Sequence, residues 1–308
     1  MKKRAFIFPG QGAQYVGMAK DFYDTDADCK AVIDNGADAL DFDLRAILFE
    51  PNELINKTEY TQAAMLAAEV CVLKAVEKAG AECMITAGLS LGEYAALVAC
   101  GAMDYIDALK VVRKRGIYME NAVPAGKGGM SAIIGLDAGV IEEACAKVSE
   151  ETGLCVVPAN YNCPGQIVIS GDKAAVDRAG ELLKEGGAKL VAPLNVSGPF
   201  HSPLLKVAGD QLSRVLEGVK ISGAKVPYVC NVSAEKVTDT SLTADMLVRQ
   251  VYSPVRWEQS VRLMLSEGVE EFIEIGPGKT LAGFMKRIDR AIPVVTINGV
   301  EDIAKLTV

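Results

Sequence analysis

The sequence predicts a mixed α/β fold, and three observations support this prediction. The chain has 308 residues, of which 50% are hydrophobic, and this is enough to bury a large core. Short apolar runs alternate with longer segments of helical periodicity. Several of these runs end in a glycine-rich turn directly before a helix, as strands do in α/β proteins. We therefore expect a sheet that is covered by helices.

Residues 4–8 predict a buried first strand that ends at the glycine-rich loop 9–14. The loop lacks the G-x-G-x-x-G spacing of a dinucleotide-binding turn. It nevertheless follows the carboxyl end of a strand, where ligands bind in open α/β sheets. We expect its backbone N–H groups to face a ligand.

Two helices are predicted in the sequence, one before and one after the next strand. Residues 60–79 have the periodicity of a long amphipathic helix whose apolar side carries small residues, which allows close packing on the sheet. Residues 105–121 predict a further helix that carries Arg113, Lys114 and Arg115. A basic run of this kind is by itself typical of a solvated face.

The stretch Gly88-Leu89-Ser90-Leu91-Gly92 has the spacing G-x-S-x-G. The apolar run 83–87 before it predicts a strand, and residues 93–100 predict a helix, which is the context of a nucleophile elbow. This pattern is typical of an α/β-hydrolase-like main domain. An alternative is that Ser90 only caps the helix, with Glu93 completing a capping box.

A Pro- and Gly-rich stretch, 123–129, precedes a change of pattern. The segments beyond it predict the order β-α-β-β-α-β, which is that of a ferredoxin-like unit. They are a strand at 130–135, a helix at 137–149, strands at 155–159 and 166–170, a helix at 172–185 and a strand at 189–194. We therefore predict a main α/β domain formed by residues 1–125 and 196–308, and an inserted ferredoxin-like small domain at 126–195.

The main domain then resumes with further helices and strands. These are a helix at 204–216, a strand at 226–230, helices at 243–251 and 255–266, and a strand at 270–275. The final strand runs into the turn 276–280, which does not match a P-loop because Ile273 stands where the pattern requires glycine.

Composition excludes several classes of function. Lys and Arg number 32 against 40 acidic residues, so the net charge of −8 argues against a nucleic-acid-binding protein. No apolar stretch is long enough for a membrane span, and the N-terminal apolar run is too short for a signal peptide. We expect a soluble, cytoplasmic protein with no membrane partner. The eight cysteines form no C-x-x-C, and a single histidine cannot build a multi-histidine metal site, so we expect no metal.

His201 is the one candidate base for an activated serine. An attacking serine needs a proton acceptor, and histidine titrates nearest to neutral pH. A lone histidine is often structural, but His201 lies in the loop 198–203 between the predicted small domain and the returning main domain, and such loops often carry function.

Several sequence blocks occur together in one order along essentially the whole chain. The blocks are Pro9-Gly10-Gln11-Gly12-Ala13-Gln14, Gly88-Leu89-Ser90-Leu91-Gly92-Glu93-Tyr94, Arg115-Gly116, Ala159-Asn160-Tyr161-Asn162-Cys163-Pro164-Gly165-Gln166, Phe200-His201-Ser202, Ser253-Pro254-Val255-Arg256-Trp257 and Glu274-Ile275-Gly276-Pro277-Gly278-Lys279. With these blocks the chain resembles the malonyl-CoA:acyl-carrier-protein transacylases of fatty-acid synthesis.

The resemblance implies a role for each matching residue. Ser90 would be the nucleophile and His201 its general base, with the imidazole oriented by a main-chain carbonyl near Gln250. The backbone N–H groups of Gln11 and Leu91 would form the oxyanion hole.

Further positions would bind the substrate. Arg115 would pair with the malonyl carboxylate, for which a planar guanidinium is suited. Gln62, Met119 and Asn160 would line the pocket, and Phe200 would narrow it against an α-methyl branch. The family usually has His where this chain has Leu89, so we expect a more apolar pocket and a shifted acyl preference.

The resemblance also implies the reaction and its partners. Malonyl-CoA would be the substrate, acyl carrier protein the acceptor, and no cofactor would be bound permanently. A monomer is expected. Because the carrier protein is acidic, a local basic patch is needed, and the candidates are Lys189, Lys286, Arg287 and Arg290.

Other functions stay open at this point. A serine esterase or thioesterase would share the elbow and would need an acid such as Asp137, Asp172 or Asp177 between the serine and the histidine. A non-catalytic carrier-protein-binding module could keep the fold. A trans-acting polyketide-type acyltransferase would use the same residues.

Overall fold

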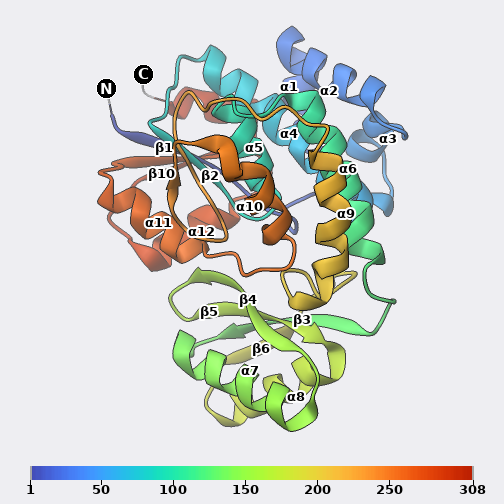
Figure 1. Cartoon of the computed structure of the whole chain (residues 1–308). Coiled ribbons are helices and arrows are strands. Elements are labelled where there is room, and N and C mark those ends of the chain that lie inside the picture. Colours follow the sequence, from blue (N-terminus) through green and yellow to red (C-terminus); the bar gives the residue numbers. More distant parts are fainter. Residues whose placement is uncertain (1, 307–308) are drawn as a thin grey trace.

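The main sheet is mostly parallel and lies in the upper part of the molecule (Figure 1). The computed structural model describes residues 2–306, so residues 1, 307 and 308 of the predicted main domain lie outside the described residues. Within the described part, the strand order is β10-β9-β1-β2-β7-β8. The strands are β1 (Arg4–Phe8), β2 (Ile85–Gly88), β7 (Tyr228–Val229), β8 (Lys236–Val237), β9 (Glu271–Ile275) and β10 (Val294–Ile297). Strand β1 pairs in parallel with β2 and β9, so its carboxyl end adjoins the serine turn.

Helices cover both faces of this sheet, because side chains along a strand alternate between its faces. Phe6 and Phe8 of β1 face one core, and Ala5 and Ile7 face the other. The first core includes α2 (Ala27–Ala39), α4 (Thr58–Lys78), α5 (Gly92–Ala99), α6 (Tyr105–Asn121) and α9 (Lys206–Leu216). The second core includes α11 (Trp257–Ser266) and α12 (Thr280–Ile288). The remaining helices are α1 (Lys20–Thr25), α3 (Leu44–Phe49), α10 (Thr243–Gln250) and the 3-10 helices η1 (Leu54–Asn56), η2 (Pro203–Leu205), η3 (Thr240–Leu242) and η4 (Val300–Lys305). No helix of residues 2–306 combines the length and the apolar character that crossing a lipid bilayer requires.

Helix α4 differs from its prediction because it is buried around nearly its whole circumference. Its exposed residues gather near its C-terminal end, at Lys74, Glu77 and Lys78. Alanines along its length are fully buried, which lets α5 and α6 approach it closely. The predicted amphipathic character is therefore wrong, and the helix is a central element of the core.

The second sheet lies below the first and is antiparallel (Figure 1). Its strands are β3 (Gly128–Ile134), β4 (Val156–Cys163), β5 (Gln166–Asp172) and β6 (Leu190–Pro193), in the order β4-β5-β3-β6. Helices α7 (Ala138–Thr152) and α8 (Lys173–Glu185) pack on the face directed away from the main sheet. The opposite face contributes Met130, Ala132 and Val168 to the core of the main domain. The chain order of these elements is the predicted β-α-β-β-α-β.

The structure corrects several predicted boundaries. Strand β7 is shorter than residues 226–230, and strands β8 and β10 were not predicted. Helix α11 begins only at Trp257, because Val255 is extended and pairs with β4. The N–H of Val255 donates to the carbonyl of Ala159 at 2.8 Å, and the carbonyl of Val255 accepts from the N–H of Tyr161 at 2.9 Å. These bonds connect β4 of the second sheet to the segment before α11, which packs in the second core of the main domain.

Candidate active site

The turn between β2 and α5 places Ser90 in a left-handed backbone conformation with φ of 55°. Such a conformation is strained for a residue with a side chain and is common at functional sites. A Cβ atom at Gly88 would lie 1.9 Å from the backbone of Gly92, and one at Gly92 would lie 2.3 Å from the carbonyl oxygen of Phe8. Both glycines are therefore required for this close approach of strand, turn and helix.

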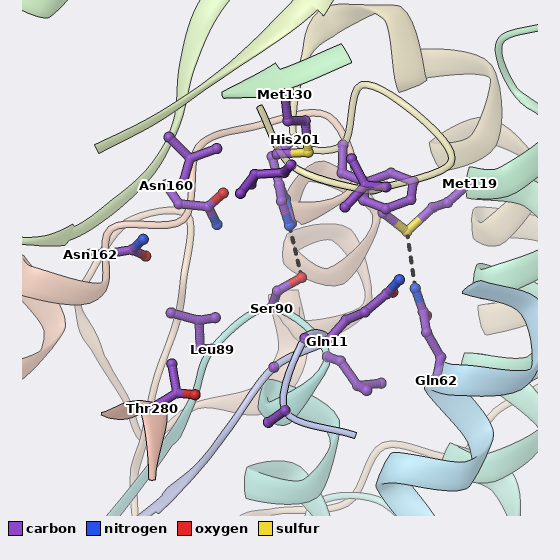
Figure 2. Close-up of a pocket in the computed structure, with 18 of the residues that line it drawn as sticks. Gln11, Gln62, Leu89, Ser90, Met119, Met130, Asn160, Asn162, His201 and Thr280 are labelled. Atoms are coloured by element: carbon purple, nitrogen blue, oxygen red, sulfur yellow. Dashed lines mark hydrogen bonds between the residues drawn. The ribbon is translucent and has the colours of Figure 1, made fainter. Parts of the chain in front are cut away.

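The structure contradicts the capping interpretation of Ser90. Helix α5 begins at Gly92 and its N-cap position is Leu91, with no side-chain cap. The Ser90 hydroxyl instead bonds to Nε2 of His201 at 2.7 Å, as Figure 2 shows. The carboxylate of Glu93 also turns away from the helix end and binds Gln250 and Asn231. The serine hydroxyl is thus directed at another side chain, not at its own helix.

The imidazole of His201 has a defined tautomer. Its Nδ1 lies 2.7 Å from the carbonyl oxygen of Gln250, and a carbonyl only accepts, so Nδ1 carries the proton. Nε2 is then the acceptor for the Ser90 hydroxyl. Burial, together with the nearby charge of Arg115, lowers the pKa of His201 to about 4. The imidazole is therefore neutral at neutral pH and can accept a proton from Ser90.

The acids considered for a serine–acid–histidine triad lie elsewhere. Asp172 accepts a hydrogen bond from the N–H of Cys155, and Asp177 pairs with Lys173. Asp137 is the N-cap residue of α7. All three belong to the segment with the second sheet, and Nδ1 of His201 is already bonded to the Gln250 carbonyl. None of these acids orients the histidine, so the predicted triad is wrong for them.

Ser90 and His201 open into a cleft of about 220 Å³ between the two sheets. Figure 2 shows Met130, Asn160 and Asn162 on the side of the second sheet, with Gln11, Gln62 and Met119 on the opposite side. Residues that line the cleft and were predicted for the site are Gln11, Gln62, Leu89, Ser90, Leu91, Arg115, Met119, Asn160, Phe200 and His201. This volume suits a short acyl group better than a long chain.

Arg115 projects from α6 into this cleft and is 1% exposed. It donates to Oε1 of Gln62 at 2.7 Å, to Oε1 of Gln250 at 2.9 Å and to Oγ of Ser90 at 3.1 Å. Its Nε is buried without a hydrogen-bond partner in the described part of the chain. All of its hydrogen-bond partners are neutral, and burial lowers its pKa. The guanidinium can therefore receive an anionic group beside the serine hydroxyl.

The basic run on α6 is not a solvated face. Lys114 is exposed, but Arg113 is 8% exposed and forms ion pairs with Asp41 and Glu59 at 2.9 Å each. The prediction failed because residues 113 and 115 face different buried surroundings, which the helical spacing of a short run does not reveal.

The loop after β1 lies against the serine turn. A Cβ atom at Gly10 would lie 2.6 Å from the carbonyl oxygen of Leu89, so glycine is needed there. Gln11 and Leu91 both line the cleft beside Ser90. Among the loop and turn hydrogen bonds of residues 2–306, none uses the backbone N–H of either residue as donor. Both N–H groups can therefore serve a ligand.

Sequence reasoning missed two buried residues beneath the turn. Asn231 accepts a hydrogen bond from the N–H of Ser90 at 2.7 Å and donates to the carbonyl of Gly88 at 2.7 Å. Asn231 directly follows the predicted strand 226–230, which neighbours β2. A polar residue at the carboxyl end of a strand could have been recognised as a candidate for the site. Glu93 was considered only as a cap. The other lining residues that were not predicted are Gly10, Gly12, Ala13, Met130, Asn162, Val168, Leu194, Val196, Thr280 and Phe284.

The candidate basic patch lies partly at the junction of the two sheets. Lys189, Lys286, Arg287 and Arg290 are all exposed. Arg287 donates to Oε1 of Gln166 on β5 at 2.9 Å and so connects α12 to the second sheet. The Lys189 side chain packs against Gly135, whose N–H donates to the carbonyl of Gly165 beside Arg287.

Known proteins share this whole architecture. The model of the acyl transferase domain family matches residues 5–301. Malonyl CoA-acyl carrier protein transacylase of Bacillus subtilis (strain 168) is 46% identical over 304 residues, which are 98% of this chain and 96% of that protein. The acyl carrier protein S-malonyltransferase of Vibrio cholerae superposes with a TM-score of 0.96 at 43% identity, covering 99% of this chain and 100% of that one.

A second similar structure is PlMCAT, a malonyl-transacylase in complex with the type II polyketide acyl-carrier protein AntF. It has a TM-score of 0.95 at 40% identity, and the match covers 99% of this chain and 98% of that one. The mixed α/β fold is thus shared with solved malonyltransferases. The chain therefore belongs to the acyl transferase domain family, and within it to the malonyl CoA-acyl carrier protein transacylases.

Proposed function

We propose that this chain transfers a malonyl group from malonyl-CoA to the phosphopantetheine thiol of acyl carrier protein through an ester on Ser90. The observation that carries the proposal is the Arg115 guanidinium, which has only neutral partners and lies 3.1 Å from the Ser90 hydroxyl. A carboxylate held there would bring the carbonyl of a short diacid to the serine. The names of the relatives support this substrate and acceptor.

In the first half-reaction, Oγ of Ser90 attacks the thioester carbon while Nε2 of His201 takes the hydroxyl proton. The N–H groups of Gln11 and Leu91 would stabilise the oxyanion, each by roughly 3–4 kcal/mol. The carbon–sulfur bond then breaks, and the departing CoA thiolate takes the proton from His201. The malonyl ester on Ser90 remains.

In the second half-reaction, the carrier thiol gives its proton to His201 and attacks the ester carbonyl. The ester bond breaks, Ser90 regains its proton, and the malonyl thioester of the carrier leaves, which completes a ping-pong cycle. Water must be kept from the ester. An apolar cover over the cleft supports this requirement: Met130 and Val168 belong to the second sheet, and Leu194 directly follows β6.

Selectivity follows from the groups around the ester. A malonyl carboxylate satisfies Arg115, whereas an acetyl group leaves the buried guanidinium without an anion. Phe200 narrows the cleft against an α-methyl branch. Leu89 lines the cleft with an apolar side chain where the family usually has histidine. Gln62, Met119 and Asn160 shape the remaining wall, and the Gln250 carbonyl orients His201.

The finer description of the fold belongs to the same proposal. We assign an α/β-hydrolase-like main domain to residues 1–125 and 196–308 and an inserted ferredoxin-like domain to residues 126–195. The sheet order β4-β5-β3-β6 supports the second assignment. The protein would act as a cytoplasmic monomer without a permanently bound cofactor, and carrier protein would dock at the basic patch near Lys189 and Arg287.

A polyketide carrier is the second candidate acceptor. The similarity to PlMCAT, whose solved complex contains the type II polyketide carrier AntF, favours it. A serine thioesterase is the remaining alternative, and it would release malonate to water instead of transferring it.

One experiment tests these assignments. Purified protein is incubated with malonyl-CoA, acetyl-CoA or methylmalonyl-CoA, and the malonylated Ser90 peptide is measured by mass spectrometry before and after addition of a phosphopantetheinylated carrier. We expect a malonyl ester on Ser90 that disappears when carrier is added. Rapid formation of free malonate without carrier would support the thioesterase and contradict the proposal.

A further inference from the structure

A buried glutamate lies beneath the serine turn and contacts both residues whose side chains hold this turn. Glu93 is 1% exposed and lies in the first turn of α5. Its Oε2 accepts a hydrogen bond from Nε2 of Gln250 at 2.5 Å, and its Oε1 accepts one from the backbone N–H of Asn231 at 3.3 Å. One carboxylate thus connects α10 and the segment after β7 to the helix that follows Ser90.

Gln250 and Asn231 hold the backbone on both sides of the strained serine. Nε2 of Gln250 donates to the Ser90 carbonyl at 2.9 Å, and Oδ1 of Asn231 accepts from the Ser90 N–H at 2.7 Å. Ser90 keeps its left-handed conformation between these two contacts. Glu93 bonds to the side chain of Gln250 and to the backbone N–H of Asn231, and so contacts both residues that make these bonds.

The side-chain amide of Gln250 can adopt only one of its two orientations. A carboxylate only accepts hydrogen bonds and a guanidinium only donates them. The amide nitrogen must therefore face Glu93, and the amide oxygen must face Arg115, which donates to it at 2.9 Å. The main-chain carbonyl of the same Gln250 holds Nδ1 of His201 at 2.7 Å.

We infer that Glu93 is a positioning residue for the acyl transfer, because its carboxylate selects the orientation of the Gln250 side-chain amide that holds Arg115 and the Ser90 carbonyl. The inference rests on the proposed function and deepens it by naming a residue outside the cleft lining. Burial raises the pKa of Glu93 to about 7, so a fraction of the chains would carry a protonated Glu93 at neutral pH. The titratable groups around it are Arg115, Tyr94, Tyr228 and Cys230.

The substitution Glu93→Gln tests the selection directly. It preserves the size of the side chain but replaces one acceptor oxygen by a donor NH2 group. When the NH2 group of the introduced side chain faces Gln250, the Gln250 amide must turn its oxygen toward this NH2 group. The NH2 group of Gln250 then faces Arg115. Two donors then face each other, and Arg115 and the Ser90 backbone lose their fixed positions.

The matched control is Glu69→Gln. Glu69 on α4 is also completely buried, and its carboxylate has no hydrogen-bond partner among residues 2–306. It does not line the cleft. This substitution likewise replaces a buried carboxyl group by an amide, but it leaves the contacts of Gln250 and Asn231 unchanged.

Two quantities are measured on the full chain, one rate and one ratio of rates. The first is labelling of Ser90 by a fluorophosphonate probe, which reports serine reactivity without any acyl donor. The second is the ratio of Ser90 acylation by malonyl-CoA to that by acetyl-CoA. For Glu93→Gln we expect labelling to slow about tenfold and the acylation ratio to fall about threefold, which corresponds to the loss of a hydrogen bond to a charged group. Glu69→Gln is expected to retain both values.

The fraction of folded protein is measured in parallel by chemical denaturation. Glu93→Gln protein that labels as fast as the native chain, or that loses activity only in proportion to its unfolded fraction, would overturn the inference. Failure of the native chain to react with malonyl-CoA would instead overturn the proposed function. Because the probe requires no acyl-CoA, the contribution of Glu93 to Ser90 reactivity would still be measured in that case.

Discussion

The surroundings of Arg113 and Arg115 differ sharply, although both side chains are buried and both arise from α6. Arg113 is held by Asp41 and Glu59, and it also lies over the rings of Phe42 and Tyr60. Arg115 has glutamine and serine oxygens as its acceptors and faces the cleft. A buried cation that is already paired with carboxylates has its charge balanced within the fold. One whose charge is left for a ligand indicates a binding site.

The largest effect is expected when the serine beside Arg115 is removed. Ser90→Ala eliminates the nucleophile but leaves the guanidinium in place. We expect malonyl transfer to fall by about 10⁴-fold or more, because the ester cannot form. Single-turnover transfer to the carrier is the measurement. Substantial transfer by this variant would mean that Arg115 marks a binding site which is separate from the reacting group.

The two arginines are next compared directly by substitution with alanine. Arg115→Ala should lower kcat/KM for malonyl-CoA by about 10²-fold with a much smaller effect on acetyl-CoA, because only the malonyl group has the carboxylate. Arg113→Ala should leave this ratio unchanged and lower the free energy of unfolding by roughly 1–3 kcal/mol. Denaturant titration and acyl-CoA kinetics on both variants check this pair. A similar outcome for both arginines would remove the distinction between them.

The pH dependence of transfer tests His201 and Glu93, two buried ionisable groups that lie near the charge of Arg115. His201 must be neutral to accept the serine proton, and its pKa is lowered to about 4, so activity should persist well below pH 6.5 and be lost near pH 4. Protonation of Glu93 below about pH 7 should add an earlier, partial decrease. This earlier step should be absent from Glu93→Gln. A single decrease centred near pH 6.5 in the native chain would contradict the geometry of His201.

The smallest effect is expected at Leu89, which tests whether Arg115 alone sets selectivity. Leu89→His introduces a polar ring into the apolar side of the cleft. We expect a change of about two- to fivefold in the ratio of malonyl to acetyl transfer, because one altered contact is worth about 1 kcal/mol. Steady-state kinetics with both acyl-CoAs measure the ratio. An unchanged ratio would show that the residue before the serine has no influence on acyl choice.

Local patterns predicted the elements that short-range chemistry determines. Strand β1 and helix α6 have their predicted bounds, and the G-x-S-x-G spacing predicted the strained turn at Ser90. The order of the elements in the second sheet was also predicted. In each case the relevant forces act between residues that are close in sequence.

The rest depends on contacts between distant segments. Val255 begins a segment that was predicted to be a helix, yet it pairs with β4, whose residues stand about a hundred positions earlier. Arg113 and Arg115 belong to one basic run, and only the elements packed around α6 separate their roles. Asn231 and Gln250 meet Glu93 through the tertiary fold alone. A single sequence contains no local signal for such contacts.

The pairing of Val255 with β4 has a consequence for protein engineering. The two bonds use only the N–H and carbonyl groups of the backbone, which are the same for every residue except proline. An insertion from another family member could therefore keep these two bonds with any residue except proline as the donor, provided that its apolar face also fits the core that receives Met130, Ala132 and Val168. The segment that covers the cleft is thus suited to exchange as a unit, and chimeras could acquire new acyl preferences without redesign of the serine turn.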